Sequence, residues 1–370
     1  MVPASIANCT PSHVSWWLLA GIVLASSCSG INDRDGRRTS AIVYGADDRV
    51  EYFQASSDIQ ALTRQSVAAL IPKKEIRAEG TTLTISAPTW GRAAGLCAGE
   101  PFAEQPSAAF CSGVLVDWDL VVTAGHCVRY LALDQFYVVF GYYYVAPGTL
   151  APDAEAIEAF RIEGEALDPA GSFPRLDYAW LRLSRIPSAP RRPAAMYVTP
   201  PPLDGGEMVL SIGTGGGVPA KIDRGGLVED VREGSMDYFV ASSDTTRGSS
   251  GGAAFDAHLA VTGVLVRGGI DLAPTDAGCA ATIHLADDAG VGEEFTYAHA
   301  AVRGLCDGGT SASYLCQPDC GSPCQVPAVR SDAAGGCSWG GTDGDERTGL
   351  AVAAAMIAVT VSRRRFCRSV

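Results

Sequence analysis

Three short segments, far apart in the chain, restrict what this sequence can form. They are TAGHC at 123–127, DYAWL at 177–181 and GSSGG at 248–252. In that order they supply an imidazole, a carboxylate and a hydroxyl, which are the groups that let a serine attack an acyl carbon at neutral pH. The three segments therefore predict nucleophilic catalysis by a serine.

Each group has an expected role, and two of them have a rival. His126 follows a strand-like Val-Val-Thr run and would act as the general base. Asp177 would accept the Nδ1–H of His126, which fixes the tautomer and stabilises the imidazolium, and Asp168 is the rival carboxylate. Ser249 and Ser250 are the neighbouring candidates for the nucleophile.

Each segment resembles the matching block of the chymotrypsin-like serine proteases, the trypsin family. Register with that family's Gly-x-Ser-Gly-Gly selects Ser250 over Ser249. The resemblance also implies a disulfide between Cys111 and Cys127, which lie sixteen residues apart. It implies an all-β fold of two antiparallel six-stranded β-barrels, with a protein or peptide substrate bound in the cleft between them.

The resemblance spans about residues 41–305, and it is closer to the bacterial branch that includes the glutamyl endopeptidases. In the animal digestive branch, an aspartate before the nucleophile pairs with a new N-terminal ammonium. Here that residue is Ser249, although IVYG at 42–45 is faintly similar to the activation site. We therefore expect activity without such an ion pair.

The glycines around the nucleophile let the backbone bend tightly, so the N–H groups of Gly248 and Ser250 are expected to form an oxyanion hole. In the family, the residue six before the nucleophile lies at the base of the specificity pocket. That residue is Asp244, which would pair with a basic side chain. Some glutamate-specific relatives share this aspartate, and Arg267 near the rim would favour an acidic substrate, so both specificities stay open. The other residues expected to line the pocket are Thr245, Val266 and Gly268.

The segment 248–252 also fits Gly-x-Ser-x-Gly, the nucleophile elbow of α/β-hydrolases. That fold needs its histidine after the serine and a helix immediately following the serine. Here His126 comes earlier, and residues 253–266 have a strand-turn-strand pattern. An esterase of that fold is the weaker enzyme alternative, and an inactive, protease-like surface binding module is the alternative without catalysis.

Short β-type runs separated by Gly, Pro and Asp begin near residue 66, and helical periodicity is weak throughout. We assign residues 66–305 to the two-barrel domain, with the proline-rich stretch near 187–206 as the crossing between barrels. GTGGG at 213–217 lacks the Gly-Lys-Ser/Thr ending of a phosphate-binding loop. It is therefore predicted to be a glycine-rich loop without that function.

Charge and cysteine content narrow the partners and the compartment. A net charge of −13, with no basic block before the extreme C-terminus, argues against nucleic acid as a partner. Twelve cysteines are typical of an oxidising compartment. The cysteines at 306, 316, 320 and 324 have no histidine among them, which favours disulfides over zinc. We expect no metal and no cofactor.

The N-terminal end predicts export. Residues 1–28 have the pattern of a signal peptide, and LASSC ending at Cys28 resembles a bacterial lipoprotein box. Ordinary cleavage and lipidation of Cys28 stay open as alternatives. Residues 29–65 are expected to form a leader or N-terminal arm.

The C-terminal end predicts retention at the cell surface. Residues 306–337 are expected to form a Cys-rich stalk, and 338–370 resemble the C-terminal sorting tails of myxobacterial surface proteins. A buried C-terminal helix is the alternative for the apolar stretch. We expect a secreted or cell-surface protein of the outer envelope of a Gram-negative bacterium, with membrane anchoring through this tail or a lipid on Cys28.

Overall fold

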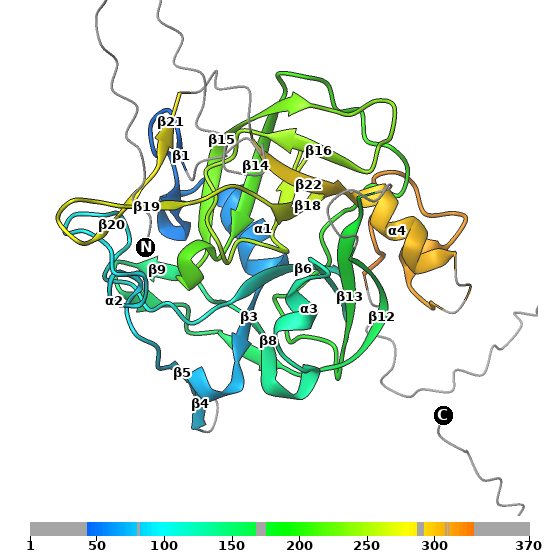
Figure 1. The fold of residues 1–370 in the computed structure, drawn as a ribbon. Coiled ribbons are helices and arrows are strands. Elements are labelled where there is room, and N and C mark those ends of the chain that lie inside the picture. Colours follow the sequence, from blue (N-terminus) through cyan, green and yellow to red (C-terminus); the bar gives the residue numbers. More distant parts are fainter. Residues whose placement is uncertain are drawn as a thin grey trace, which may run out of the picture. The chain divides into compact units, whose positions relative to one another are not determined.

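The structure is a computed structural model, and it describes most of the chain between Val43 and Ala328 (Figure 1). The described residues are 43–79, 82–167, 175–286, 292–307, 309 and 311–328. The signal peptide with Cys28, the sorting tail and Asp168 lie outside the described residues.

The first half of the described chain forms one antiparallel sheet that curls on itself (Figure 1), in the order β11-β8-β3-β6-β7-β13-β12. Its strands are β3 (Val67–Pro72), β6 (Cys111–Asp117), β7 (Leu120–Thr123), β8 (Phe136–Phe140), β11 (Glu155–Ile157), β12 (Ala159–Leu167) and β13 (Asp177–Leu183). The two end strands, β11 and β12, are separated in the chain by Glu158 alone. The two edges of the sheet therefore meet, and the sheet curls round as in a barrel.

The second half forms a closed barrel of six strands, in the order β14-β17-β18-β22-β16-β15, because β15 pairs back with β14. Its strands are β14 (Met208–Gly213), β15 (Lys221–Asp230), β16 (Tyr238–Ala241), β17 (Ala253–Phe255), β18 (Val261–Arg267) and β22 (Glu293–Tyr297). β2 (Val50–Glu51) is added outside β15. Residues 184–207, which include the proline-rich stretch, connect the first sheet to this barrel.

One apolar core joins the two barrels. Every residue of β6, β7 and β13 is buried, because these strands are covered on both faces. Trp180 and Phe136 are among the largest fully buried side chains, and in the second barrel Phe239 stacks on Phe295 with ring centroids 5.1 Å apart. A close-packed scaffold of this kind keeps functional side chains at its rim in fixed positions.

Two helices flank the barrels. α1 (Ser57–Ser66) buries Ile59 and Leu62 against β3 and β6. α4 (Ala298–Cys306) covers β12, β18 and β22, and its Ala301 carbonyl accepts a hydrogen bond from Nε1 of Trp180 at 3.2 Å. The shorter helical segments are α2 (Trp90–Ala94), α3 (Cys127–Tyr130), η1 (Tyr52–Gln54), η2 (Lys73–Glu75), η3 (Leu133–Gln135), η4 (Gly215–Gly217) and η5 (Tyr314–Cys316). The weak helical periodicity of the sequence had not indicated α1 or α4.

Four small two-stranded sheets and four disulfides complete the described part. The sheets pair β1 (Val43–Tyr44) with β21 (His284–Leu285), β4 (Ile76–Glu79) with β5 (Thr82–Ile85), β9 (Tyr144–Ala146) with β10 (Thr149–Leu150), and β19 (Leu272–Pro274) with β20 (Ala280–Thr282). The disulfides are Cys97–Cys279, Cys111–Cys127, Cys306–Cys316 and Cys320–Cys324. Within the described residues, every helix is too short or too polar to span a bilayer.

The fold extends beyond both boundaries expected at 66 and 305. Residues 43–65, expected to form a leader or arm, contribute β1, β2 and α1, and β2 pairs with β15. Residues 306–327, expected to belong to a stalk, pack on the barrels, because the backbone of Cys324 exchanges two hydrogen bonds with that of Met196. The compact unit therefore includes both segments.

The architecture is the mostly β, two-barrel fold of the chymotrypsin type that the sequence predicts. Both sheets are antiparallel, and the GSSGG segment is followed by strand β17. An α/β-hydrolase has a helix at that place and a largely parallel sheet. The fold therefore argues against the esterase alternative.

Candidate active site

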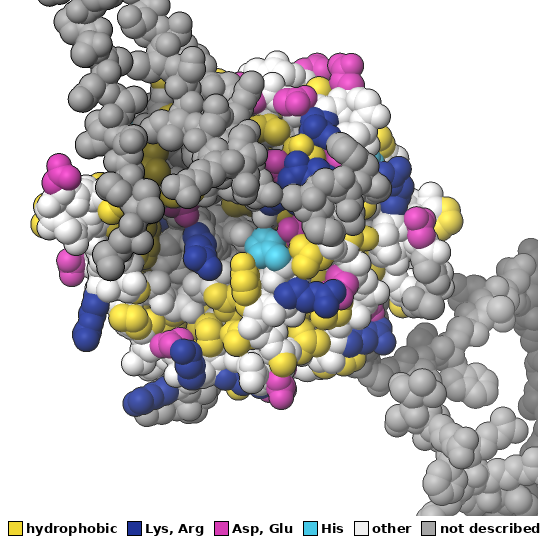
Figure 2. All heavy atoms as spheres, in the orientation of Figure 1, with side chains coloured by type: hydrophobic (Ala, Val, Ile, Leu, Met, Phe, Trp, Pro, Cys, Tyr) yellow, Lys and Arg dark blue, Asp and Glu magenta, His cyan; other side chains and the backbone are white. Residues whose placement is uncertain are grey.

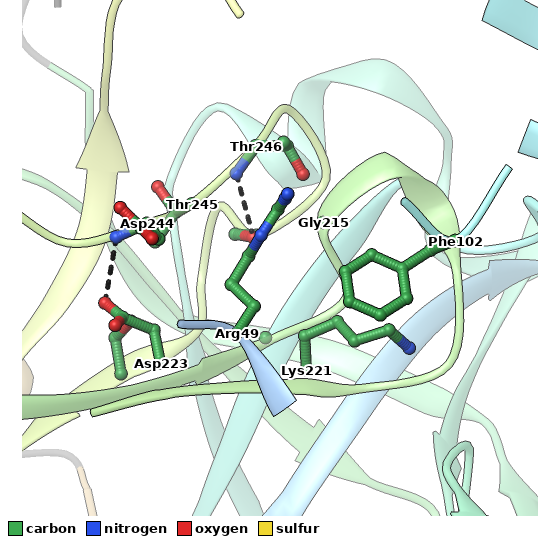
Figure 3. A pocket seen from close by; sticks show the side chains of 11 residues that line it. Arg49, Phe102, Gly215, Lys221, Asp223, Asp244, Thr245 and Thr246 are labelled. Atoms are coloured by element: carbon green, nitrogen blue, oxygen red, sulfur yellow. Dashed lines mark hydrogen bonds between the residues drawn. The ribbon is translucent and has the colours of Figure 1, made fainter. Parts of the chain in front are cut away.

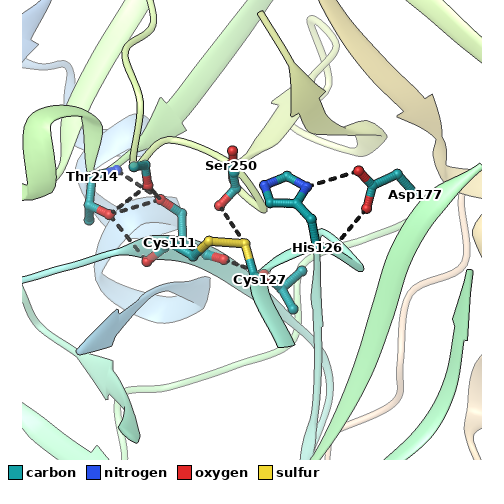
Figure 4. Close-up of a disulfide and its surroundings, with 9 residues drawn as sticks. Cys111, His126, Cys127, Asp177, Thr214 and Ser250 are labelled. Atoms are coloured by element: carbon teal, nitrogen blue, oxygen red, sulfur yellow. Dashed lines mark hydrogen bonds and ion pairs between the residues drawn. A yellow bond between two sulfur atoms is a disulfide. The ribbon is translucent and has the colours of Figure 1, made fainter. Parts of the chain in front are cut away.

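His126 is held at the rim of the first barrel, just after β7, by one carboxylate (Figure 4). Its backbone N–H donates to Oδ1 of Asp177 at 3.0 Å, and its ring Nδ1 lies 2.8 Å from Oδ2 of the same residue. Gly125 makes this approach possible, because a Cβ there would lie 2.2 Å from the carbonyl oxygen of Ala166. The imidazole is therefore fixed with its Nε2 edge free.

Asp177 begins β13 and connects the first barrel to the second. Its side chain is nearly inaccessible, and its backbone N–H and C=O both bond the Thr296 hydroxyl of β22, at 3.3 and 3.1 Å. Nη1 of Arg267 lies 4.0 Å from its Oδ2. A carboxylate placed in this way holds the imidazole in one tautomer and stabilises the imidazolium.

The structure brings Cys111 and Cys127 together in a disulfide that ties the start of β6 to the residue after His126 (Figure 4). The next residue of β6, Ser112, donates its backbone N–H to the carbonyl oxygen of Ser250 at 2.7 Å. The histidine and the predicted nucleophile are therefore linked to the same strand.

Ser250 and its neighbours form a tight turn in which two backbone carbonyls are hydrogen-bonded. The carbonyl of Arg247 accepts from Gly216 at 2.9 Å, and that of Ser249 accepts from Gly252 at 2.8 Å. The N–H on the other end of each peptide, in Gly248 and Ser250, points in the opposite direction. Among the described residues neither N–H has a protein acceptor. Two unpaired donors of this kind can stabilise an oxyanion.

The glycine-rich loop at 213–217 supports this turn. The hydroxyls of Ser112 and Thr214 lie 3.0 and 3.2 Å from the carbonyl oxygen of Gly248, and Thr214 N–H donates to Oγ of Ser112 at 2.8 Å. Gly248 has φ of +106°, and a Cβ there would lie 2.8 Å from the carbonyl oxygen of Thr214. Sequence reasoning had given this loop no role, because its partners lie far apart in the chain.

Ser249, which stands where the animal branch has an aspartate, is buried without an ion pair. Its hydroxyl accepts only a long hydrogen bond from the backbone of Thr246, at 3.5 Å, drawn as a dashed line in Figure 3. The contacts of Ser112, Thr214 and Gly216 hold the turn from the other side. The geometry is consistent with an oxyanion loop that needs no N-terminal ammonium.

Asp244 lines a pocket, drawn in Figure 3, that differs from the pocket beside Ser250. It is 5% exposed. Its carboxylate accepts hydrogen bonds from the backbone N–H groups of Tyr44 and Asp48, at 2.7 and 3.3 Å. Burial raises its pKa to about 7 despite these bonds. The backbone of the segment at 43–51 therefore occupies the carboxylate that the sequence placed at the base of the specificity pocket.

A pocket of about 180 Å³ does lie beside Ser250. Of the residues expected to line it, Thr245 and Gly268 do so. Val266 is instead in the core, at 3% exposure. Asp271 and Glu293 also line it, and sequence reasoning missed both because no motif surrounds them.

A larger groove of about 750 Å³ shares Thr246, Arg247, Gly269 and Asp271 with this pocket. Phe110 and Tyr130 line it from the first barrel, and Gly216 and Gly248 from the second. In Figure 2 a histidine lies near the centre of the visible face, with apolar side chains beside it. The groove offers an extended chain a path past both barrels.

One acidic cluster lies apart from this groove. Oxygens of Asp48, Asp223 and Asp244 lie within 4.8 Å of one another. Burial raises the pKa of Asp223 well above its usual range. Backbone N–H groups already bond Asp223 and Asp244, and we assign no metal to the cluster.

Many solved structures are similar to this chain, and two of them are described here. VesB protease of Vibrio cholerae is 17% identical with a TM-score of 0.41, and the match covers 70% of this chain and 65% of that one. An inactivated protease paralogue of the scabies mite, SMIPP-S-I1, is 16% identical with a TM-score of 0.43, over 70% of this chain and 96% of that one. This chain thus spans about 65% of the length of the Vibrio protein. Comparison with curated protein sequences gives no match.

The family comparison matches the part of the chain that carries the site. Residues 111–264 match the family model described as Trypsin-like peptidase domain. This range begins at Cys111 and includes His126, Asp177 and Ser250. Residues 111–264 of this chain are therefore similar in sequence to the trypsin-like peptidase domain.

Proposed function

We propose that this protein is a serine endopeptidase that hydrolyses peptide bonds in protein or peptide substrates through an acyl-enzyme. The observation that carries the proposal is the ring of His126, which lies between the Asp177 carboxylate and Ser250 (Figure 4). The unpaired N–H groups beside Ser250 and the family match of residues 111–264 support the same reaction class.

In this mechanism, Nε2 of His126 takes the Ser250 proton as the hydroxyl oxygen attacks the substrate carbonyl carbon. The N–H groups of Gly248 and Ser250 donate to the oxyanion that forms. Asp177 stabilises the imidazolium through its 2.8 Å contact with Nδ1. His126 then gives the proton to the leaving amine, and water repeats the cycle on the acyl-enzyme.

We also propose that the protein acts outside the cytoplasm, secreted or held at the surface of a Gram-negative bacterium. Four disulfides among the described residues support an oxidising compartment. Residues 1–28 would direct export, and the tail at 338–370 or a lipid on Cys28 would anchor the protein. The neutral Ser249 supports a place in the bacterial branch that includes the glutamyl endopeptidases.

The test is labelling of the protein with a fluorophosphonate probe, which reacts with an activated serine. The unmodified chain and Ser249→Ala should be labelled and should cleave a denatured protein substrate. Ser250→Ala should do neither, because it lacks the attacking oxygen. Absence of labelling in a folded, unmodified chain would contradict the proposal and favour the protease-like binding module.

A further inference from the structure

The pocket beside Ser250 contains two carboxylates that the proposed mechanism does not use, those of Asp271 and Glu293. In a protease, the substrate side chain next to the cleaved bond must lie close to the nucleophile, so a pocket at that place selects among side chains. The polar groups inside it therefore bear directly on which peptide bonds are cleaved.

Glu293 is built into the wall of this pocket. It begins β22, is 4% exposed and accepts a hydrogen bond from the Tyr44 hydroxyl at 3.4 Å. Its carboxylate fills the space beside Gly268, where a Cβ would lie 1.7 Å from Oε2. Glycine at 268 thus leaves room for an acid at this place.

Asp271 brings a second acid to the same pocket. Its carboxylate accepts the N–H of Arg247 at 2.7 Å, and burial raises its pKa to about 6. Burial, with the charge of Asp271, raises the pKa of Glu293 well above its usual range. Burial disfavours the ionised form of both acids, and the charge of Asp271 disfavours that of Glu293 further, so a cation bound in the pocket would stabilise both carboxylates.

The arginines that line the pocket do not fill this role. Arg267 donates through Nε to the Glu294 carboxylate and through Nη2 to the Arg175 carbonyl at 3.1 Å, so its guanidinium is already paired. Arg247 lines the same pocket but is exposed to solvent. The interior of the pocket is therefore acidic.

We propose that Glu293, assisted by Asp271, makes this protein select substrates with a lysine or arginine side chain before the cleaved bond. This rests on the proposed function. A cationic side chain would form charge-assisted hydrogen bonds with the buried carboxylate. An acidic side chain would meet like charge, and a neutral one would leave the charge of the carboxylate without a counterion. The group that binds the basic side chain is thus Glu293 on β22 instead of Asp244.

The test measures binding of benzamidine, a small aryl cation, by isothermal titration calorimetry. The full chain carrying Ser250→Ala is used, so that the result does not depend on catalysis. Benzamidine should bind this protein, and adding Glu293→Gln should weaken binding about 10–100-fold, as expected for a lost hydrogen bond to a charged partner. Glu293→Asp should restore part of it, and Asp271→Asn should have a smaller effect. Glu229→Gln makes the same chemical change at an exposed position of β15 and should leave binding unchanged.

Two binding results would overturn the inference. One is absence of benzamidine binding, and the other is tight binding in Glu293→Gln with loss in Asp244→Asn, which would return the role to Asp244. If Glu293→Gln does not fold, Asp271→Asn and Glu293→Asp still report on the pocket. Mapping of cleaved bonds separates the two proposals. If a labelled enzyme cleaves after acidic or apolar residues, selection of basic residues is refuted and the peptidase proposal stands. If the protein is not labelled, the peptidase proposal is refuted, and benzamidine binding alone then tests whether the pocket prefers a cation.

Discussion

The two barrels hold their parts of the site by different means. In the first barrel, one side chain, Asp177, bonds both the backbone and the ring of His126. In the second, backbone hydrogen bonds from Gly216 and Gly252 orient the two peptide groups whose N–H groups are the expected oxyanion donors. The position of Ser250 depends on the same turn. The part of the site on the first barrel therefore depends on one carboxylate, and the part on the second barrel depends on the conformation of glycine residues.

Asp177→Asn should break the first barrel's half of the site and have the largest effect. The amide has one acceptor oxygen for two donors, the backbone N–H and Nδ1–H of His126. If the oxygen accepts from the backbone N–H, the NH₂ group faces Nδ1, which must then act as an acceptor, so the ring proton moves to Nε2. In the wrong tautomer His126 cannot take the serine proton, and kcat should fall about 10⁴-fold. Steady-state kinetics on a peptide substrate measures this.

Asp134→Asn is the matched control, because Asp134 is exposed and does not line the groove. It should keep the kcat of the unmodified protein. If Asp177→Asn retained more than about a tenth of that kcat, His126 would not need this carboxylate for orientation, and the contrast between the barrels would fail.

Gly248→Ala should break the second barrel's half. Gly248 has φ of +106°, and the new Cβ would lie 2.8 Å from the Thr214 carbonyl oxygen, so the peptide must rotate and withdraw one oxyanion donor. Losing one such donor costs about 10²–10³ in kcat. Gly205→Ala is the control, since nothing lies within 4 Å of a Cβ there. Equal activity of the two variants would mean that Gly248 does not place an oxyanion donor.

The same contrast explains how much of the site could be predicted from sequence. The positions of His126 and Ser250 follow from local motifs, and so does the disulfide pair Cys111 and Cys127, which the resemblance implies. The short apolar runs also indicate most strands of both barrels. What could not be predicted depends on contacts between distant segments, such as the Ser112 hydroxyl near the carbonyl of Gly248.

The missed elements have the same cause. β12 has a mixed polar sequence because its residues are mostly half-exposed, so it lacks the apolar run that marks the other strands. α1 and α4 are short, and burial of one face against the barrels stabilises them more than their own propensity does. The contacts of Asp244 could not be predicted either, because its spacing from Ser250 says nothing about the backbone N–H of Tyr44, which donates to its carboxylate.

Ser112→Ala tests whether a side chain contributes to the turn of the second barrel. It removes the hydroxyl 3.0 Å from the Gly248 carbonyl, but keeps the backbone bond from residue 112 to Ser250. The Gly248 carbonyl then loses one donor but keeps the Thr214 hydroxyl, and the N–H of Thr214 loses its acceptor. We expect kcat to fall tenfold or less with KM little changed. Ser86→Ala, at an exposed position, is the control. A loss as large as that of Gly248→Ala would show that the side chain, and not the glycine, fixes the turn.

The barrels also differ in how they shift the pKa of an acidic side chain. In the first barrel burial would raise the pKa of Glu163 on β12, but hydrogen bonds from Arg182 and Arg161 lower it to about 2. In the second barrel burial raises the pKa of Asp244 to about 7, against the backbone bonds from Tyr44 and Asp48. The Glu163 contribution to stability is lost in acid, as pH falls from the unfolded value near 4.5 towards 2. The Asp244 contribution should have the opposite sign.

Asp244→Asn tests this last contrast and should have the smallest effect. In the unfolded chain Asp244 loses its proton near pH 4, whereas in the folded protein it keeps the proton until about pH 7. Between these values the folded state binds more protons, so the unfolding free energy falls as pH rises. Asparagine resembles the protonated acid and cannot ionise, so the variant should raise Tm by about 2–6 °C at about pH 8 and by less at about pH 5.

The carboxylates of Asp48 and Asp223 and the guanidinium of Arg49 also face Asp244 and remain in place, so differential scanning calorimetry of the two proteins isolates the one substituted group. A Tm gain that is equal at both pH values, or larger in acid, would show that Asp244 is ionised throughout and that burial does not set its charge.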